Sequence, residues 1–109
     1  MLFRSLQGGV WNGQQVVPAA WLERATRQFI SVAHTGYKGY QGYGLHWWRK
    51  TFNVAGTPVQ GIHADGFAGQ AIMVFPAFEL VVVVTGGNYS RPELEHSLVA
   101  NHVLPAVVH

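Results

Sequence analysis

The chain has 109 residues, 49% of them hydrophobic and only 11% charged, which suits one small folded domain and excludes an intrinsically disordered chain. The net charge is +2 with the histidines neutral, and the seven basic residues form no continuous stripe, so no nucleic-acid partner is indicated. The absence of cysteine excludes disulfides and thiolate metal sites, and the low charge indicates that part of the surface is hidden against another surface.

The first part of the chain is predicted to hold two helices separated by a tight turn. Residues 1–7 carry apolar side chains on one helical face, and two glycines follow them and end the helix. The dipeptide Asn12-Gly13 predicts a hairpin turn. Pro18 suits a first helical turn, and the apolar spacing after it predicts an amphipathic helix of about three turns over residues 18–30.

The middle of the chain is predicted to be a glycine-rich loop followed by antiparallel strands. The loop covers residues 31–44, where four glycines and three tyrosines show no period. Strands are expected at residues 43–50, 59–65 and 70–75, with a turn at Gly56 to Pro58 between the first two.

The last part of the chain is predicted to add an apolar strand and a helix. Residues 80–85 are apolar almost throughout, which indicates a strand buried on both faces by covering helices, and the run is too short to cross a membrane. A capping box of Ser90 and Glu93 starts the helix, and Pro105 ends or kinks it. The element order predicts an α+β fold, an antiparallel sheet flanked by helices, in a single domain over residues 1–109.

Six histidines and four serines are the first candidates for chemistry, but none has the spacing of a known catalytic or metal site. No His-x-x-x-His pair occurs, and His96 and His102 do not share a helical face, so no metal is indicated and both are expected at the surface. No serine lies in Gly-x-Ser-x-Gly or precedes a lysine by three residues. Glu93 and Glu95 are expected to open the last helix, where negative charge is favourable, and they offer no obvious acid/base pair.

The stretch His-Ala-Asp-Gly-Phe-Ala-Gly-Gln, residues 63–70, places two glycines at the end of a predicted strand. A glycine in a strand lets a ligand or another backbone approach closely, so a main-chain amide here could hold a developing negative charge, or a substrate could lie alongside. The alternative is a β-bulge followed by a turn, in which the glycines are required only for backbone geometry, and the pattern alone favours that alternative.

Four segments in order resemble the C-terminal part of the serine β-lactamase-like hydrolases. This group includes class C β-lactamases, penicillin-binding proteins, esterases and 6-aminohexanoate-dimer hydrolases. The segments are GGVWNGQQVVPAAWLERAT, GYGLHWW, ADGFAGQAIMVFPAFELVVVVTGGN and NHVLPAV, and the similarity spans roughly residues 3–107. The resemblance implies an antiparallel sheet flanked by helices, with the catalytic serine in a second, helical region that is not part of this sequence.

The resemblance places site residues around the family's third motif, Lys-Thr-Gly, because Ser-x-x-Lys and Tyr-x-Asn are absent here. The third motif falls on Ala64-Asp65-Gly66, with alanine and aspartate in place of lysine and threonine. In an alternative register His63 substitutes for the lysine, with one extra residue before Gly66. By resemblance the Phe67 N–H is the second oxyanion-hole donor, and Gly66 permits the approach.

The resemblance implies a small-molecule substrate and no cofactor. Because the motif lysine, which would recognise a β-lactam carboxylate, is absent, an ester or amide substrate is expected. The tyrosines of the glycine-rich loop, Tyr37, Tyr40 and Tyr43, could line the substrate pocket, with surface packing as the alternative. We expect this chain alone to be inactive, since it supplies a sheet wall and one oxyanion donor but no nucleophile.

The alternative from another class is a non-catalytic binding module. The sheet would then pair its open edge, or cover a bare face, with a second copy, giving a homo-oligomer. Four tryptophans and the low charge favour this alternative.

Overall fold

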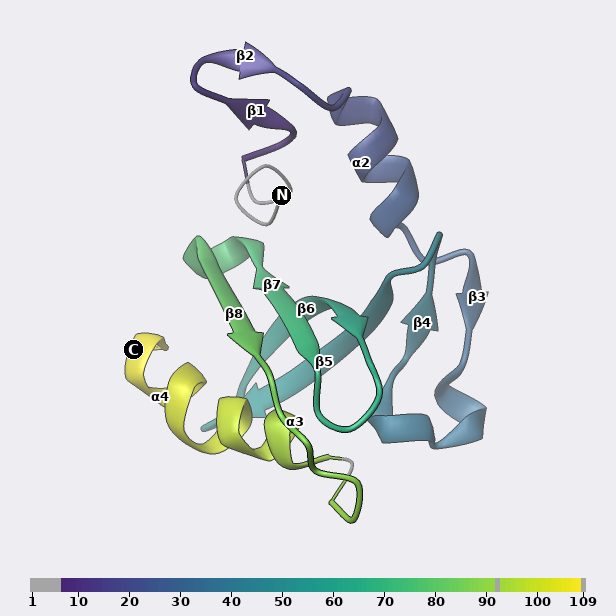
Figure 1. The fold of residues 1–109 in the computed structure, drawn as a ribbon, viewed down its shortest axis with the longest axis vertical. Coiled ribbons are helices and arrows are strands. Elements are labelled where there is room, and N and C mark those ends of the chain that lie inside the picture. Colours follow the sequence, from purple (N-terminus) through teal and green to yellow (C-terminus); the bar gives the residue numbers. More distant parts are fainter. Residues whose placement is uncertain (1–6, 92, 109) are drawn as a thin grey trace.

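A six-stranded antiparallel sheet forms the centre of the computed structural model, which describes residues 7–91 and 93–108 (Figure 1). The strands lie in the order β3-β4-β5-β6-β7-β8, so each strand pairs with its neighbour in sequence. Their bounds are Ile30–Ser31, Gly42–Tyr43, Trp48–Val54, Thr57–Asp65, Ala71–Phe75 and Leu80–Val84. A separate hairpin of β1 (Val10–Trp11) and β2 (Gln14–Gln15) precedes the sheet.

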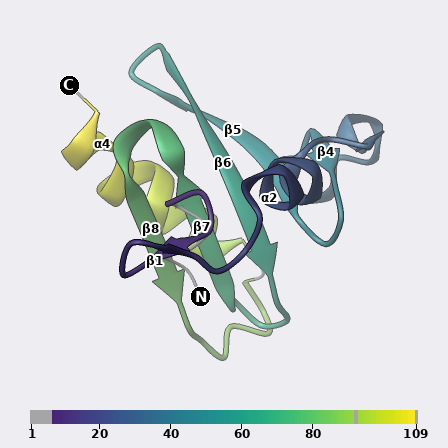
Figure 2. The same ribbon diagram turned by 90° about the horizontal axis from the view of Figure 1, so that it is seen from above.

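Helices lie on both sides of the long β5–β6 hairpin at the centre of the sheet. They are α2 (Ala19–Thr26), α3 (Leu94–Leu98) and α4 (Leu104–Val107), with a π-helical turn, η4 (Val99–Val103), between the last two. Short 3₁₀ turns are η1 (Ala33–Thr35), η2 (Tyr37–Gly39) and η3 (Pro76–Phe78). Figure 2 shows α4 and α2 on opposite sides of the β5–β6 hairpin. The mixture of helices with an antiparallel sheet confirms the predicted α+β class. No helix among the described residues has the length and apolar character needed to cross a bilayer.

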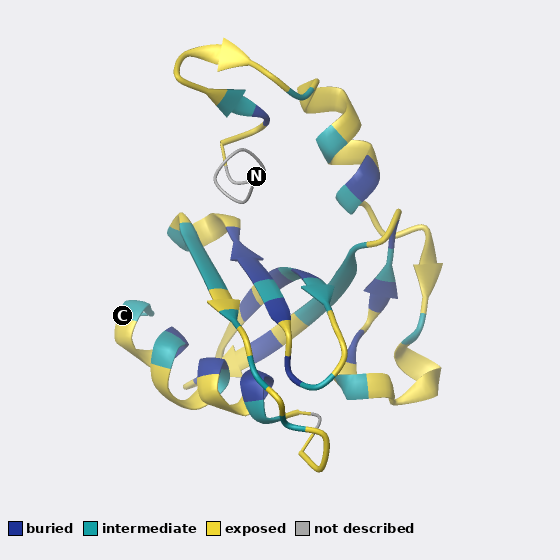
Figure 3. Ribbon diagram, viewed as in Figure 1, coloured by how far each residue is buried: buried dark blue, intermediate teal, exposed yellow. Residues whose placement is uncertain are grey.

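The hydrophobic core lies between the sheet and the C-terminal helices. Alternate side chains of β5, β6 and β7 point to this side, because Phe52 pairs with Val59 and His63 with Met73. Figure 3 shows the buried residues along the central strands and on α3, η4 and α4. The core consists of Phe52, Val54, Val59, Ala71, Met73, Phe75, Val99 and Leu104. Burial of each large side chain contributes about 1.5–3 kcal/mol, so this layer is the main source of stability.

The opposite face of the sheet is only partly covered in the described part of the chain. The C-terminal end of α2 reaches it, where Arg49 Nη1 donates to the Thr26 carbonyl at 2.6 Å. Farther along the same face Ile72 is half-buried and Val83 is 53% exposed. The prediction that the last strand is buried on both faces is therefore wrong. Strand β8 lies at the edge of the sheet, where β7 is its single strand partner among the described residues.

The N-terminal predictions are confirmed for the turn and corrected for the helices. Asn12 and Gly13 have φ of 50° and 75°, the positive pair that a two-residue hairpin turn requires. The helix predicted at 1–7 lies outside the described residues, apart from Gln7. Helix α2 ends at Thr26 instead of residue 30, because the Phe29 N–H donates to the Tyr43 carbonyl at 3.0 Å and the chain joins the sheet.

Two boundaries in the middle of the chain also differ from prediction. The ends of the predicted 31–44 loop pair as β3 and β4, and β5 begins only at Trp48 instead of at residue 43. The chain turns just before β5, since His46 has φ of 68° and the Gly44 N–H donates to the Trp47 carbonyl at 2.7 Å. The next turn is at Ala55-Gly56, one residue earlier than expected, so Pro58 lies inside β6.

The C-terminal helix begins later than predicted and continues past Pro105. It starts at Leu94, and no side chain caps its first turn, so the predicted capping box of Ser90 and Glu93 is wrong. Pro105 does not end the helix, which continues to Val107. The π-helical turn just before Pro105 changes the hydrogen-bond spacing, which accommodates a residue that has no N–H.

Candidate functional site

A cleft of about 600 Å³ opens where β6 ends and the chain turns towards β7. Three segments form its walls: the 35–38 turn, the 65–68 turn, and the stretch that precedes α3. Its volume is that of a pocket for a small organic molecule. The predicted glycine-flanked strand end therefore borders a real cleft.

The turn at Gly66 and Phe67 borders this cleft and leaves one main-chain amide without a partner among the described residues. The Gly66 N–H donates to the Gln70 carbonyl at 2.7 Å, which closes the turn. The Phe67 side chain is 82% exposed, and none of the hydrogen bonds in the described part of the chain uses the Phe67 N–H. A Cβ on Gly66 would lie 2.8 Å from the Gln70 Cβ, so the turn requires glycine there. The role of Phe67 as an oxyanion donor stays a prediction.

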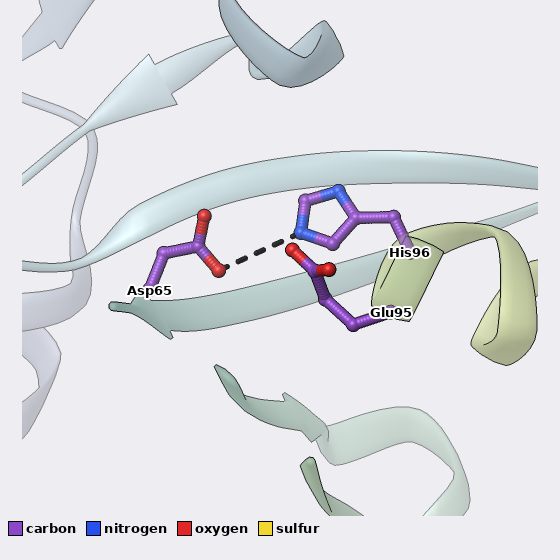
Figure 4. Close-up of side chains that lie close together, drawn as sticks. All are labelled: Asp65, Glu95 and His96. Carbon is purple, nitrogen blue, oxygen red and sulfur yellow. Dashed lines mark ion pairs between the residues drawn. The ribbon is translucent and has the colours of Figure 1, made fainter. Parts of the chain in front are cut away.

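A buried ion cluster lies behind the cleft and consists of Lys38, Lys50, Asp65, Glu95 and His96. The Lys38 Nζ lies 2.8 Å from the Asp65 Oδ2 and 3.5 Å from the Glu95 Oε1. The three side chains are 10%, 4% and 1% exposed, respectively. Figure 4 shows that Asp65 enters the cluster from the end of β6, and Glu95 and His96 from α3.

His96 connects the two sides of the ion cluster. Its Nε2 lies 3.2 Å from the Tyr40 hydroxyl and 3.7 Å from the Asp65 Oδ1. Its Nδ1 lies 2.9 Å from the Lys50 Nζ. The ring is 3% exposed, so these neighbours, and not solvent, decide which nitrogen carries a proton.

Burial and neighbouring charges shift several pKa values in and around the ion cluster. Burial alone would raise the pKa of Asp65, but polar interactions with His96, Lys38 and Tyr40 outweigh burial and lower it to about 2. Burial alone would lower the pKa of Lys38, but Asp65 raises it above its ordinary value. Burial lowers the pKa of Lys50. At neutral pH Asp65 and Lys38 are therefore a charged pair.

Four buried polar atoms have no hydrogen-bond partner among the described residues: His63 Nδ1 and Nε2, Asp65 Oδ1 and Glu95 Oε2. The His63 ring is fully buried and stacks on Phe52 with ring centroids 5.7 Å apart. Burial lowers the pKa of His63 to about 3, so the ring is neutral at physiological pH. Buried polar atoms are normally paired, so each unpaired one marks either a cost in stability or a place for a ligand.

The structure brings together only part of the predicted site. Asp65, Gly66 and Phe67 line the cleft. Ala64 points to the other side of β6 and lines a separate hollow with Ile72. His63 lies in the core between the sheet and the helices, and it is not among the residues that line the cleft.

The three tyrosines of the glycine-rich loop have three different environments. Tyr37 is 51% exposed and lines the cleft. Tyr40 is 1% exposed and stacks on Trp48, with ring centroids 4.8 Å apart. Tyr43 packs against the same tryptophan, with ring centroids 4.4 Å apart, and is not part of the cleft lining.

Sequence reasoning missed the ion cluster, and the expectation that His96 lies at the surface is wrong. His96 and Glu95 are 3% and 1% exposed. They lie three and four residues before the buried Val99, so all three share one helical face. This spacing was the available signal, but Glu95 was assigned to the first turn of the helix for its negative charge, and His96 was assigned to the surface.

Comparisons with known proteins identify no relative: no family model matches the chain, and neither curated proteins nor solved structures give a match. Function is therefore argued from the geometry of this chain. The cleft is lined by Phe67, whose N–H has no partner among the described residues, and by the cationic Lys38, and the ion cluster contains unpaired carboxylate oxygens.

Proposed function

We propose that this chain supplies one wall and one oxyanion-hole amide of a serine hydrolase of the β-lactamase-like class, acting on an ester or amide. The observation that carries the proposal is that Phe67 lines a cleft of about 600 Å³ and its N–H has no acceptor among the described residues. An amide that is fixed in place and free of internal bonds stabilises the oxygen that gains negative charge during acyl transfer.

The lining of the cleft suits a small molecule with a carbonyl group and an apolar substituent. Phe67 and Tyr89 pack edge to face, with ring centroids 5.5 Å apart, and form an apolar rim. Tyr37 adds a third exposed ring to the lining. Lys38 lies in the same lining, and its positive charge favours an anionic transition state even though Asp65 partly neutralises it.

The described lining of the cleft contains no serine, so the attacking group comes from other polypeptide. Its one hydroxyl outside the tyrosines belongs to Thr35, which donates to the Val32 carbonyl at 2.7 Å and accepts from the Tyr37 N–H at 3.2 Å. Both hydrogen bonds of that hydroxyl stabilise the turn, so it is not a candidate nucleophile. The chain alone is therefore expected to hydrolyse p-nitrophenyl butyrate and nitrocefin no faster than buffer does. Turnover that disappears when one of its own serines is changed would refute the proposed division of the active site.

The oxyanion role is tested on the chain itself with a tetrahedral anion. Butylphosphonate resembles the intermediate of ester hydrolysis, and its titration into ¹⁵N-labelled protein should shift the Phe67 amide resonance saturably. Phe67→Ala and Phe67→Pro form a matched pair, because both remove an exposed ring and only proline removes the N–H. Binding should persist in the alanine variant and disappear in the proline variant. Equal binding by both variants would exclude this amide as the donor.

The proposed hydrolase activity is tested with an extended protein that includes the residues encoded upstream of Met1. If those residues include Ser-x-x-Lys, the extended protein should hydrolyse p-nitrophenyl butyrate. Phe67→Pro should then lower kcat by about 10²–10³-fold, the usual loss for one oxyanion-hole donor, whereas Phe67→Ala should retain most of the activity.

We propose a self-associating module as the second candidate, because one observation favours it. Strand β8, Leu80–Val84, is a sheet edge that carries no charge and no proline, and such edges pair with other strands. The expected partner is β8 of a second copy. Sedimentation velocity at micromolar concentration should then show a dimer, and Val83→Lys should dissociate it. A wild-type monomer under those conditions removes this candidate.

A further inference from the structure

We propose that Asp65, Glu95 and His96 form a binding site for one divalent transition-metal ion such as Zn²⁺. One ligand atom from each side chain lies within 4.8 Å of the others. Asp65 comes from the end of β6 and the other two from α3, so an ion would join the sheet to the C-terminal helix (Figure 4). The inference does not depend on the proposed hydrolase function.

The Asp65 and His96 ligand atoms have nearly the spacing of a tetrahedral site. Zn²⁺ holds oxygen and nitrogen ligands at about 2.0–2.2 Å, which places neighbouring ligand atoms about 3.4 Å apart. The Asp65 Oδ1 and the His96 Nε2 are already 3.7 Å apart. The third ligand atom, a carboxylate oxygen of Glu95, lies within 4.8 Å of both.

The unpaired oxygens of the two carboxylates are an independent indication of a ligand. Asp65 Oδ1 and Glu95 Oε2 have no hydrogen-bond partner in the described part of the chain, although their side chains are only 4% and 1% exposed. An unpaired buried oxygen is destabilising, and the cost is greater for a charged group. A metal ion between them would pair both oxygens at once.

Lys38 lies next to this site without blocking it. Its Nζ contacts the Asp65 Oδ2 and the Glu95 Oε1, which leaves the other oxygen of each carboxylate open. Lys38 belongs to the short turn η2, has φ of 45° and also lines the cleft.

The donor set indicates which ions the site would prefer. One imidazole nitrogen and two carboxylate oxygens suit Zn²⁺, Mn²⁺ or Fe²⁺, whereas Ca²⁺ prefers oxygen ligands alone. The Tyr40 hydroxyl, 3.2 Å from the His96 Nε2, is a fourth polar group at the same place. Asp65 also lines the cleft, so this is the side from which an ion would enter.

Calorimetric titration with ZnCl₂ and thermal unfolding test the site in the purified chain. We expect one ion per chain and a higher Tm. Glu95→Gln should weaken Zn²⁺ binding by more than about 100-fold, because even the partners of metal ligands are worth about 10–100-fold. Glu93→Gln is the matched control, since Glu93 is exposed and outside the ligand set, and it should bind like the wild type. The absence of binding, or binding that Glu95→Gln leaves unchanged, would overturn the proposal.

A measurement on the unaltered protein covers the case in which Glu95→Gln does not fold. Paramagnetic Mn²⁺ added to ¹⁵N-labelled protein broadens the amide resonances nearest the ion. Broadening should be strongest at Asp65, Glu95 and His96. Broadening centred on the exposed His34 or His102, or none at all, would show that the cluster is not a metal site.

Discussion

The Lys38 Nζ lies 2.8 Å from the Asp65 Oδ2, and this ion pair fastens the glycine-rich loop to the end of β6. Both side chains are nearly buried, at 10% and 4% exposed. Removal of one partner leaves the other as an uncompensated buried charge, so we expect Lys38→Met to lower the free energy of unfolding by about 3 kcal/mol. Urea denaturation in the presence of EDTA measures this loss on the metal-free protein.

The pairwise nature of that contact is checked by a double-mutant cycle. Asp65→Asn removes the charge that Lys38 neutralises, so the combined variant should lose less stability than the two single variants added together. Strict additivity would mean that the two side chains act independently and that the contact contributes nothing.

His63 should be replaceable by a hydrophobic residue with a gain in stability. Its ring is fully buried, and both ring nitrogens lack partners in the described part of the chain. Leucine has a similar volume and no polar atom, so His63→Leu should raise the free energy of unfolding by about 1–2 kcal/mol at neutral pH. His102→Leu is the exposed control and should have little effect. A less stable His63→Leu protein would show that the ring has a partner or a ligand.

The same histidine should make the protein sensitive to mild acid. Burial, together with the nearby His96 and Lys50, lowers the pKa of His63 from 6.5 to about 3, although Asp65 opposes the shift. Between pH 6.5 and pH 3 the unfolded chain therefore binds a proton that the folded chain does not, and stability falls as the pH falls. From pH 6.5 to 5 the loss should be about 2 kcal/mol.

Urea denaturation of metal-free protein at pH 7.5 and 5 measures this dependence, and His63→Leu should remove most of it. Asp65, whose pKa is lowered to about 2, contributes a separate loss only below about pH 4. An unchanged pH dependence in His63→Leu would assign the acid sensitivity to another group.

Local patterns predicted the parts of the fold that depend on local chemistry. Asn12-Gly13 correctly predicted a hairpin turn because both residues adopt positive φ readily. The strands expected at 59–65 and 70–75 correspond to β6 and β7 within two residues. The start of β5 was misplaced because His46 adopts a left-handed conformation that nothing in its neighbours indicates.

Local sequence patterns did not predict the ion cluster. Lys38 and Glu95 are 57 positions apart, and only the packing of α3 on the sheet brings them together. The charge of Glu95 favours an exposed first turn, whereas its spacing of four residues from the buried Val99 places both on one face of the helix. Sites built from distant segments therefore depend on tertiary packing that local sequence patterns do not report.

Gly44 should be intolerant of any side chain, because the chain between α2 and the sheet passes it closely. A Cβ there would lie 2.4 Å from the Arg27 carbonyl oxygen and 2.8 Å from that of Ala25, and both are backbone atoms that cannot move aside alone. The Leu45 N–H donates to the same Ala25 carbonyl at 3.0 Å, so a shift would also break that bond. We expect Gly44→Ala to lower the free energy of unfolding by about 1–3 kcal/mol. Gly87→Ala is the matched control, since its Cβ would meet nothing closer than 3.9 Å, and it should change stability by less than about 0.5 kcal/mol. Equal stability of the two variants in urea would show that α2 does not dock against residues 44–45 as described.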